Sequence, residues 1–357
     1  MSKKRVAIVG LGIGRAHLEE GYSQLKDLYE VTTLCDLDQA RLDEVGQTFD
    51  VGRGVTDFEA VLGMEDVDII DICTPPSLHL QQSLKALAAG KHVICEKPLV
   101  GSLQDCDRLE AALKTSRGTL MPIFQYRWGT GFQKAKYLVD QGLTGKAYVA
   151  SCETHWKRAA DYYDIAWRGK LKIELGGVLL SQAIHLHDMM CALMGAPERV
   201  YVESATRVNP IEVEDCAVAT LKMQSGALVT LNCTLGAKQE ISRLKACFEH
   251  VTITSHSEPY APGNDPWQFD CADTAEGRAI QAALEQVPAV ASRFKGQMIA
   301  YHQALEGKAA WPVSLADARQ SLELITAFYD SAARHQAVTL PIKSDHPLYT
   351  DWRKHSL

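Results

Sequence analysis

The sequence predicts an α/β protein of two domains, and two features of its pattern carry that prediction. Over residues 1–124, short β-rich runs alternate with helix-compatible segments, which is typical of parallel strands covered by helices. After residue 125, successive β-rich runs are joined by a short turn, which favours antiparallel pairing. We therefore expect a doubly wound parallel sheet in residues 1–124 and an α+β domain in residues 125–357.

In the first domain, the expected strands and helices alternate as far as residue 124. Ser77 follows two prolines and is a candidate helix N-cap, while Gly90 is placed to end the same helix. The expected strands are residues 5–9, 31–35, 67–73, 92–95 and 119–124, and the helix-compatible segments include residues 78–89 and 103–115.

The second domain begins a different pattern. Residues 217–223 and 227–235 are strand-like, and Gln224-Ser225-Gly226 between them is typical of a hairpin turn. Residues 243–255 add further strand. Helical segments would cover one face of the resulting sheet; they are residues 177–194, 275–286 and 315–335.

Composition excludes several classes of protein. The chain has 357 residues, enough for two buried cores, and its apolar fraction of 46% excludes a disordered protein. A net charge of −7 without a long basic run argues against nucleic acid and anionic membranes as partners, and no apolar stretch approaches the length of a membrane span. The ten cysteines form no C-x-x-C pair, which favours reduced thiols in a cytoplasm over disulfides or zinc.

A glycine-rich turn closes the first expected strand and opens a helix. Gly10 and Gly12 suit a tight turn and a close approach of the backbone to a pyrophosphate, which the following helix N-terminus would also attract. The third glycine of the usual fingerprint is replaced by Arg15, with Gly14 one place early. An ordinary strand-to-helix turn is the alternative for this segment taken alone.

An acidic residue ends the second expected strand, where dinucleotide-binding domains hold the adenosine ribose. Asp36 would accept hydrogen bonds from the ribose hydroxyls and repel a 2′-phosphate, so NAD is favoured over NADP. Arg15 and Arg41 could instead bind that phosphate, and NADP therefore stays possible.

Two proline-containing segments follow the next expected strands. A lysine at the carboxyl end of a strand points into the crevice where open α/β sheets bind ligands, and Lys97 in Glu96-Lys97-Pro98 has that position. Thr74-Pro75-Pro76 should form a rigid loop at the same edge. A proline-stiffened turn with a capping serine is the alternative for that loop.

The joint order of these motifs resembles the Gfo/Idh/MocA oxidoreductases, a family named for glucose-fructose oxidoreductase and inositol dehydrogenase. The residues that carry the resemblance are Gly10-x-Gly12-x-Gly14 with His17, Cys35-Asp36, Cys73-Thr74-Pro75-Pro76 with His79, Glu96-Lys97-Pro98, and Gly176-Gly177 through Asp188. The resemblance covers nearly the whole chain. It implies a Rossmann domain, a second domain with a large open antiparallel sheet, NAD(P)-dependent hydride transfer on sugars or polyols, and a catalytic Lys97.

The cofactor site expected from the turn, the acidic strand end and the resemblance is contributed almost entirely by the first domain. Its members are Gly10, Gly12, Ile13, Gly14, Asp36, Leu37, Arg41, Thr74, Pro75, Pro76, His79, Glu96, Lys97 and Gln125.

The family's second signature is Asp-x-Gly-x-His-x-x-Asp on a helix, and here it reads from Ser181 to Asp188. Helical spacing would place Ser181, His185 and Asp188 on one face. The resemblance implies that His185 lies next to the reacting carbon, as the first Asp and the His do in the family. Ser181 replaces the first Asp; it can hold a sugar hydroxyl but cannot serve as a base. His185 and His187 diverge at this spacing, so we expect no metal. A buried structural histidine is the alternative for His185.

Aromatic residues and arginines gather just before this signature. Such faces and cations suit a polyhydroxylated ring, including one that bears a carboxylate, although a domain interface uses the same residue types. The expected substrate residues are Arg127, Trp156, Arg158, Tyr163, Trp167, Arg168, Ser181 and His185.

Together these features predict an NAD-dependent dehydrogenase that oxidises a secondary alcohol of a sugar, polyol or sugar acid, or reduces the ketone. Lys97 would stabilise the developing alkoxide and His185 would take the proton. A non-catalytic NAD-binding sensor and an NAD-dependent glycoside-cleaving enzyme are the alternatives. The resemblance also implies that the free sheet face forms subunit contacts, giving a homodimer or homotetramer.

Overall fold

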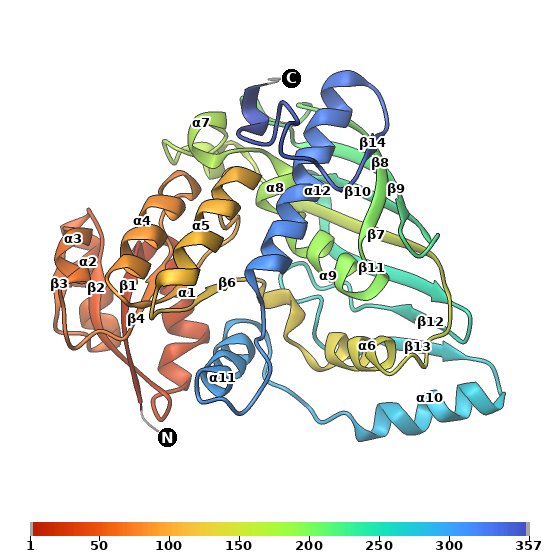
Figure 1. Ribbon diagram of the computed structural model, residues 1–357, viewed down its shortest axis with the longest axis horizontal. Coiled ribbons are helices and arrows are strands. Elements are labelled where there is room, and N and C mark those ends of the chain that lie inside the picture. The colour runs from red at the N-terminus through yellow and green to blue at the C-terminus, as the bar shows by residue number, and fades with distance from the viewer. Residues whose placement is uncertain (1–2, 355–357) are drawn as a thin grey trace. The chain divides into compact units, whose positions relative to one another are not determined.

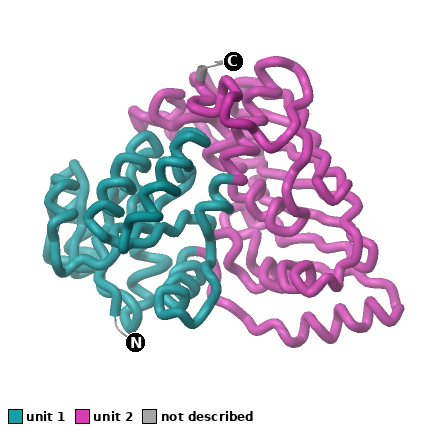
Figure 2. The backbone as a smooth tube through the Cα atoms, in the orientation of Figure 1, with its two compact units in different colours: residues 1–124, 294–319 teal, residues 125–293, 320–357 magenta. Residues whose placement is uncertain are grey.

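The computed structural model describes residues 3–354 and divides the chain into two compact units (Figure 2). Unit 1 comprises residues 1–124 and 294–319, and unit 2 comprises residues 125–293 and 320–357. The change of unit after Phe124 coincides with the change of sequence pattern. Residues 294–319, which the pattern grouped with the second domain, cluster with unit 1.

Unit 1 contains a six-stranded sheet in the order β3-β2-β1-β4-β5-β6, with every pair parallel (Figure 1). Its strands are β1 (Lys4–Val9), β2 (Tyr29–Cys35), β3 (Gly54–Val55), β4 (Ile69–Ile72), β5 (His92–Cys95) and β6 (Leu120–Pro122). Continuous apolar runs form these strands because both faces are buried; Ile8, Ile70 and Ile94 are all fully buried. The strand order reverses between β1 and β4, which is where such sheets bind ligands.

Helices connect the strands of unit 1. They are α1 (Leu11–Glu20), α2 (Gln39–Phe49), α3 (Phe58–Leu62), α4 (Pro76–Ala88) and α5 (Leu103–Thr115), with the short η1 (Tyr22–Gln24) after α1. The expected cap at Ser77 is wrong, because α4 begins at Pro76 and Pro75 is its N-cap. Gly90 follows the end of α4 with a φ of +73°, which confirms its role there.

Helix α11 (Arg293–Leu305) joins unit 1 through contacts that no local pattern contains. The Tyr29 hydroxyl donates to the Met298 carbonyl at 2.7 Å. The Gln297 side chain accepts from the Phe124 N–H at 3.1 Å and donates to the Pro122 carbonyl at 2.7 Å. These bonds tie the helix to β2 and to the end of β6.

Unit 2 contains an eight-stranded sheet in the order β13-β12-β11-β7-β10-β9-β8-β14. All its pairs are antiparallel except β7 with β10, so the sheet is mixed but mostly antiparallel, as expected. The strands are β7 (Ala147–Lys157), β8 (Pro197–Ala205), β9 (Cys216–Met223), β10 (Leu228–Thr234), β11 (Gly236–Phe248), β12 (Val251–Thr254), β13 (Gln268–Cys271) and β14 (Val338–Thr339). The hairpin between β9 and β10 is confirmed. The further strand expected over residues 243–255 is divided between the end of β11 and β12, with residues 249–250 between them.

One face of this sheet is covered by helices. Helix α9 (Ile184–Met194) packs against β7 and β11, and Ser331 of α12 (Leu315–Arg334) accepts from the Val202 N–H of β8 at 3.0 Å. Along β9, Ala217 and Ala219 are buried while Val218 is 55% exposed, so the opposite face is open. The remaining helical segments of unit 2 are η2 (Gln125–Arg127), α6 (Thr130–Asp140), η3 (Ala160–Tyr163), α7 (Leu171–Glu174), α8 (Val178–Ser181), α10 (Ala275–Gln286) and η4 (Trp352–Lys354).

None of the helices within residues 3–354 is both long enough and apolar enough to cross a bilayer. All ten cysteines are free thiols, and seven of them are buried.

Candidate active site

The glycine-rich turn between β1 and α1 has the geometry that a dinucleotide requires. Gly10 has a φ of +90°, and a Cβ built there would lie 2.7 Å from the Cys73 carbonyl oxygen, so only glycine allows the turn to approach the end of β4. A Cβ on Gly14 would meet Ile8 at 2.8 Å, whereas one on Gly12 would meet nothing within 4 Å. The turn is thus packed closely against the sheet at Gly10 and Gly14, whereas no protein atom lies near the Cβ position of Gly12. These residues fit a bound pyrophosphate.

The carboxylate that was expected to hold the ribose lies against the start of the same helix. Asp36 Oδ2 accepts from the Leu11 N–H, the first of α1, at 2.7 Å. Arg41 Nη1 lies 3.2 Å from the same oxygen, and its side chain is 45% exposed. Arg15 is held by Glu19 and Glu44 in ion pairs. The Asp36 carboxylate and the Arg41 guanidinium group are therefore in contact at the strand end where a dinucleotide-binding domain would hold the ribose.

The other expected cofactor residues differ in exposure. Ile13 is 44% and Leu37 is 89% exposed, which leaves both open to a ligand. His79 is fully buried, with Nδ1 2.8 Å from the Pro98 carbonyl and Nε2 2.8 Å from the Thr74 carbonyl. Any effect of His79 on the cofactor would pass through the two loops that it joins.

A buried charged network underlies the Glu96-Lys97-Pro98 motif. His17 Nδ1 lies 2.8 Å from Asp71 Oδ2, and His17 Nε2 lies 3.1 Å from Glu96 Oε1. The Tyr22 hydroxyl donates to the same Asp71 oxygen at 2.8 Å, and Cys73 Sγ is 3.5 Å from His17 Nδ1. Although burial by itself lowers the pKa of His17, the Asp71 carboxylate raises that pKa well above its ordinary value. The network therefore favours a charged imidazolium between two carboxylates.

Glu96 transmits this network to Lys97. Burial alone would raise the pKa of Glu96, but the hydrogen bond from His17 lowers it, so the carboxylate is charged. Its second oxygen, Oε2, accepts from the Lys97 N–H at 3.0 Å. The backbone of Lys97 is thereby fixed at the carboxyl end of β5. Sequence reasoning missed this network; the signal was Asp71, an acidic residue inside the apolar run of β4.

In unit 2, the signature histidine lies on the buried helix α9. His185 is 4% exposed, and its ring stacks on Tyr126 of η2 with centroids 4.4 Å apart. Next to that contact, Arg127 and Asp188 form a bidentate ion pair at 2.7 and 2.6 Å. Two adjacent side chains of η2 thus hold two positions of α9. His187 turns instead to Phe328, and burial lowers the pKa of His187 to about 3.

Ser181 does not share a helix with His185, so the expectation of one continuous helical face over Ser181, His185 and Asp188 is wrong. Helix α8 ends at Ser181 and α9 begins at Ile184, with a turn at Gln182 and Ala183 between them. The Ser181 hydroxyl donates to the Gly176 carbonyl at 3.3 Å. Whether Ser181 contacts substrate stays a prediction.

Six of the aromatic and arginine side chains of unit 2 meet in what we call the arginine–aromatic cluster: Trp156, Arg158, Tyr162, Trp167, Arg168 and Tyr260. The Arg158 guanidinium carbon lies 5.0 Å from the ring centroids of both Trp156 and Tyr162. The Arg168 guanidinium carbon lies 4.0 Å from Tyr162 and 4.7 Å from Trp167. The structure thus brings together four expected substrate residues, while Arg127 is held by Asp188 and Gln125 is buried in η2.

Comparison with known proteins places the chain in a family. Residues 4–124 match the family model described as "Oxidoreductase family, NAD-binding Rossmann fold", and residues 132–254 match the GFO/IDH/MocA C-terminal domain. The chain belongs to the Gfo/Idh/MocA oxidoreductases. The resemblance stated from the sequence motifs, and the two folds it implied, are confirmed.

Relatives of this Gfo/Idh/MocA chain include dehydrogenases of sugars and inositols. The myo-inositol 2-dehydrogenase of Thermotoga maritima is 29% identical over 63% of this chain and 66% of its own length. The D-glucoside 3-dehydrogenase of Escherichia coli is 22% identical over 95% of this chain and 98% of its own length. Several curated relatives are matched over about half to two thirds of their length, between 52% and 67%.

A solved structure extends the likeness to nearly the whole chain. The WlbA dehydrogenase from Bordetella pertussis, determined in complex with NADH and UDP-GlcNAcA, superposes with a TM-score of 0.84. It is 27% identical, and the match covers 96% of this chain and 99% of that one.

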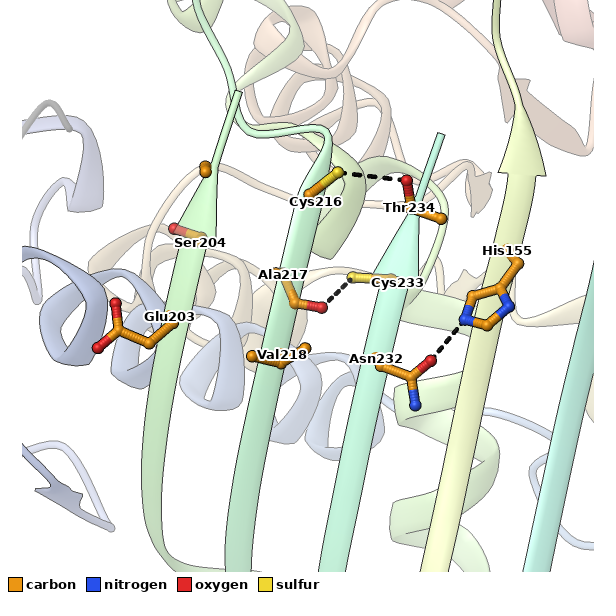
Figure 3. A pocket seen from close by; sticks show the side chains of 10 residues that line it. His155, Glu203, Ser204, Cys216, Ala217, Val218, Asn232, Cys233 and Thr234 are labelled. Carbon is orange, nitrogen blue, oxygen red and sulfur yellow. Dashed lines mark hydrogen bonds between the residues drawn. The ribbon is translucent and has the colours of Figure 1, made fainter. Parts of the chain in front are cut away.

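The open face of the unit 2 sheet carries a depression of about 420 Å³ that the sequence did not indicate (Figure 3). His155 Nε2 lies 2.5 Å from Asn232 Oδ1 at one side of it, and Cys216 Sγ lies 3.2 Å from Thr234 Oγ1. None of its lining residues is among the expected site residues. It lies on the face opposite α9.

The buried network predicts a specific pH dependence of stability. Because the folded-state pKa of His17 is raised, ionised His17 stabilises the fold fully below its unfolded pKa of about 6.5, and this contribution is lost as the pH rises through the folded value. We expect His17→Gln to remove a component of the decline in unfolding free energy above pH 6.5, a component with a slope of at most about 1.4 kcal/mol per pH unit. Urea titrations from pH 6 to 9 measure it.

The control for this experiment is His335→Gln, because His335 has a 73% exposed side chain. Its pH dependence should match that of the wild type. A His17→Gln curve that runs parallel to the wild-type curve over the whole range would show that the His17 charge does not contribute.

Proposed function

We propose that this protein is an NAD-dependent dehydrogenase that transfers hydride between nicotinamide and a secondary alcohol, or the corresponding ketone, of a sugar, polyol or sugar acid. Family membership and the sugar and inositol dehydrogenases among its relatives support this proposal. The single observation that carries it is Lys97 at the carboxyl end of β5, with its backbone held by Glu96 and, through Glu96, by buried His17. A dehydrogenase needs a cation beside the reacting oxygen, and a lysine whose backbone is held at this strand end is placed to supply it, whereas a sensor has no such requirement.

The roles of the residues follow from their chemistry. The cofactor, when bound, accepts or donates the hydride. Lys97 would hydrogen-bond the reacting oxygen and stabilise the alkoxide charge that develops on it. His185 would take the proton of the alcohol in oxidation, and Tyr126, stacked on its ring, would hold the imidazole in place. Ser181 would bind a substrate hydroxyl.

The test is a substrate screen with both cofactors. Purified protein is incubated with sugars, inositols and uronic acids, with NAD or NADP, while NAD(P)H absorbance and glycoside cleavage are followed in parallel. Net NADH formation supports the proposal. Cleavage of a glycoside without net NADH would identify the glycoside-cleaving alternative, and cofactor binding with neither reaction would identify the sensor.

Cofactor preference is a further part of the proposal. Asp36 should accept the ribose hydroxyls and repel a 2′-phosphate, so we expect NADH to bind more tightly than NADPH in fluorescence titrations. Equal or tighter binding of NADPH would contradict this and assign the 2′-phosphate to Arg41 or Arg15. Loss of that NADPH affinity in Arg41→Ala would then separate the two arginines.

We further propose that the protein is a homodimer or homotetramer built through the open face of the unit 2 sheet. Val218 is 55% and Leu228 is 58% exposed on that face, and a second copy would cover them. Light scattering at micromolar concentration should give a dimer or tetramer, and Leu228→Glu should shift it toward the monomer. A wild-type monomer would contradict the proposal. The free, mostly buried thiols support a cytoplasmic location.

A further inference from the structure

The arginine–aromatic cluster holds two guanidinium groups whose charge is only partly balanced. Arg158 Nη1 donates to Glu240 Oε1 at 3.1 Å, and this is its one ion pair with a residue that the structure describes. Arg168 forms no ion pair with any residue between positions 3 and 354. The two guanidinium groups therefore have only one carboxylate partner among the described residues, the Glu240 that pairs with Arg158. Removing a cation from water without a counter-charge is unfavourable, so the arrangement suits an anion that comes from outside the chain.

The other carboxylates nearby do not supply the missing charge. Asp161 and Asp164 lie in the same loop, but both are exposed, and neither forms an ion pair with the arginines in the described part of the chain. Glu174, which is buried, accepts from the Gly169 N–H at 2.5 Å.

Both arginines leave the same edge of the guanidinium group without a protein acceptor. Arg158 donates through Nη1 to Glu240 and to the Lys157 carbonyl, and Arg168 donates through Nη1 to the Tyr162 hydroxyl. The Nε atoms of both are buried and have no partner among the described residues. A carboxylate or phosphate accepts two parallel hydrogen bonds along the Nε–Nη2 edge. A buried donor without an acceptor is unfavourable, so an anion at this edge would remove that cost.

Hydrogen bonds connect the cluster to His185 within unit 2. The Trp156 indole N–H donates to Ser242 Oγ at 3.0 Å, and the Ser242 hydroxyl donates to the Pro259 carbonyl at 2.6 Å. The same carbonyl accepts from the Tyr126 hydroxyl at 3.2 Å, and the Tyr126 ring stacks on His185. Trp156 of the cluster and Tyr126, which stacks on His185, are therefore connected through Ser242 and one carbonyl group.

A second connection runs through the turn that separates α8 from α9. Gln182 Nε2 donates to the Tyr162 hydroxyl at 3.4 Å, and Gln182 lies three residues before His185. Its Oε1 is buried without a partner among the described residues. Tyr162 thus contacts both the turn before α9 and Arg168.

We propose that the arginine–aromatic cluster is the subsite for an anionic group on the substrate, a carboxylate or phosphate carried by the sugar, with Arg168 as its principal ligand. This inference rests on the proposed dehydrogenase function and narrows its substrate to an acidic sugar. The aromatic rings pack against the guanidinium groups and fix their orientation. A neutral sugar has no anionic group to accept from the Nε–H donors, which would then stay unpaired. A site built around such donors discriminates by about 10²-fold or more against a ligand that lacks the acceptor.

The experiment compares matched sugars that differ only in the group at C6, which is neutral in one and anionic in the others. Galactose, galacturonate and galactose 6-phosphate, and the corresponding glucose series, are assayed for NADH formation with the wild type, Arg168→Met, Arg168→Lys and the control Arg207→Met. Arg207 is exposed and lies outside the cluster. We expect kcat/KM for the acidic sugar to exceed that for its neutral partner by about 10²-fold or more. The acidic sugar with the higher kcat/KM shows whether the subsite binds a carboxylate or a phosphate.

The variants should separate this subsite from a structural role. Arg168→Met should lower kcat/KM for the acidic sugar by about 10²-fold, chiefly through KM, and change that for the neutral sugar less than about threefold. Arg168→Lys should recover part of the lost kcat/KM, because lysine keeps the positive charge but cannot donate two parallel hydrogen bonds. Arg207→Met should match the wild type. Equal losses for both sugars in Arg168→Met, or no preference for acids in the wild type, would overturn the inference.

Titration calorimetry with the enzyme–NADH complex distinguishes failure of this inference from failure of the proposed function. If no sugar is oxidised and no corresponding ketone is reduced, the dehydrogenase proposal fails, yet binding of galacturonate that is lost in Arg168→Met and retained in Arg207→Met would still support the subsite. If neutral sugars are oxidised and acidic sugars neither bind nor react better, the function stands and the anionic subsite is wrong.

Discussion

Replacing Lys97 with methionine is expected to leave NADH binding intact and to lower kcat by roughly 10²- to 10³-fold, the usual effect of removing one group that stabilises an oxyanion. Methionine is an unbranched side chain one atom shorter than lysine, and it has no charge. The Lys97 N–H would still donate to Glu96, so the loop geometry should survive. Fluorescence titration of NADH and steady-state assays with the substrate found in the screen measure the two quantities. Wild-type turnover would refute the assignment of Lys97.

His185 and Ser181 provide the comparison that separates proton transfer from positioning. His185→Ala should cost about 10²- to 10⁴-fold in turnover if the imidazole is the base. Ser181→Ala should be much milder, because a neutral hydrogen bond contributes about 0.5–1.5 kcal/mol. If His185→Ala stayed as active as Ser181→Ala, Lys97 would be the remaining candidate for proton transfer.

Breaking the Arg127–Asp188 pair is expected to have the largest effect on stability. Asp188 is 2% exposed and Arg127 is 11% exposed, so Asp188→Ala would leave a buried cation without its bidentate partner. Removing one partner of a buried pair costs about 3–5 kcal/mol of unfolding free energy. Urea denaturation followed by circular dichroism measures this. Turnover should also fall, because the pair fixes η2 against α9 and so holds Tyr126 on His185.

An exposed pair in the same unit serves as the control. Asp273 and Arg278 form an ion pair with side chains that are 91% and 67% exposed, and Asp273→Ala should change stability by less than about 1 kcal/mol. Replacing both buried partners, as in Arg127→Met with Asp188→Leu, should cost less than Asp188→Ala alone, because no unpaired charge remains. A loss below about 1 kcal/mol in Asp188→Ala would show that water reaches the pair.

Local sequence patterns were enough to predict most strands of the parallel sheet, one hairpin and the position of Lys97 at the end of β5. Local alternation of β-rich runs and helical segments is a property of neighbouring residues, and it was enough to predict the parallel sheet of unit 1 and the β9–β10 hairpin. Gly10 and Gly14 were recognisable because their role, close backbone packing in a turn, depends on the absence of a side chain. The position of Lys97 was predicted because the carboxyl ends of strands in open α/β sheets face the crevice where ligands bind.

The contacts between side chains that lie far apart in the sequence depend on how the chain folds. His17, Asp71 and Glu96 lie on α1, β4 and just after β5, and their network exists because the sheet order brings those elements together. No local period encodes such a pairing. The same holds for Arg127 with Asp188, which sequence reasoning had assigned to substrate and to the signature separately.

The fold also decided two features against the local pattern. Helix α11 joins unit 1 because Gln297 satisfies the backbone groups of Phe124 and Pro122 at the end of β6, a match between segments more than 170 residues apart. Ser181 is separated from His185 by a turn, so helical spacing in the sequence overstated their alignment. In the arginine–aromatic cluster, the sequence supplied the residue types, while the fold of the loop around Tyr162 decided which guanidinium edges kept no acceptor, because hydrogen-bond partners depend on positions in space rather than on spacing in the chain.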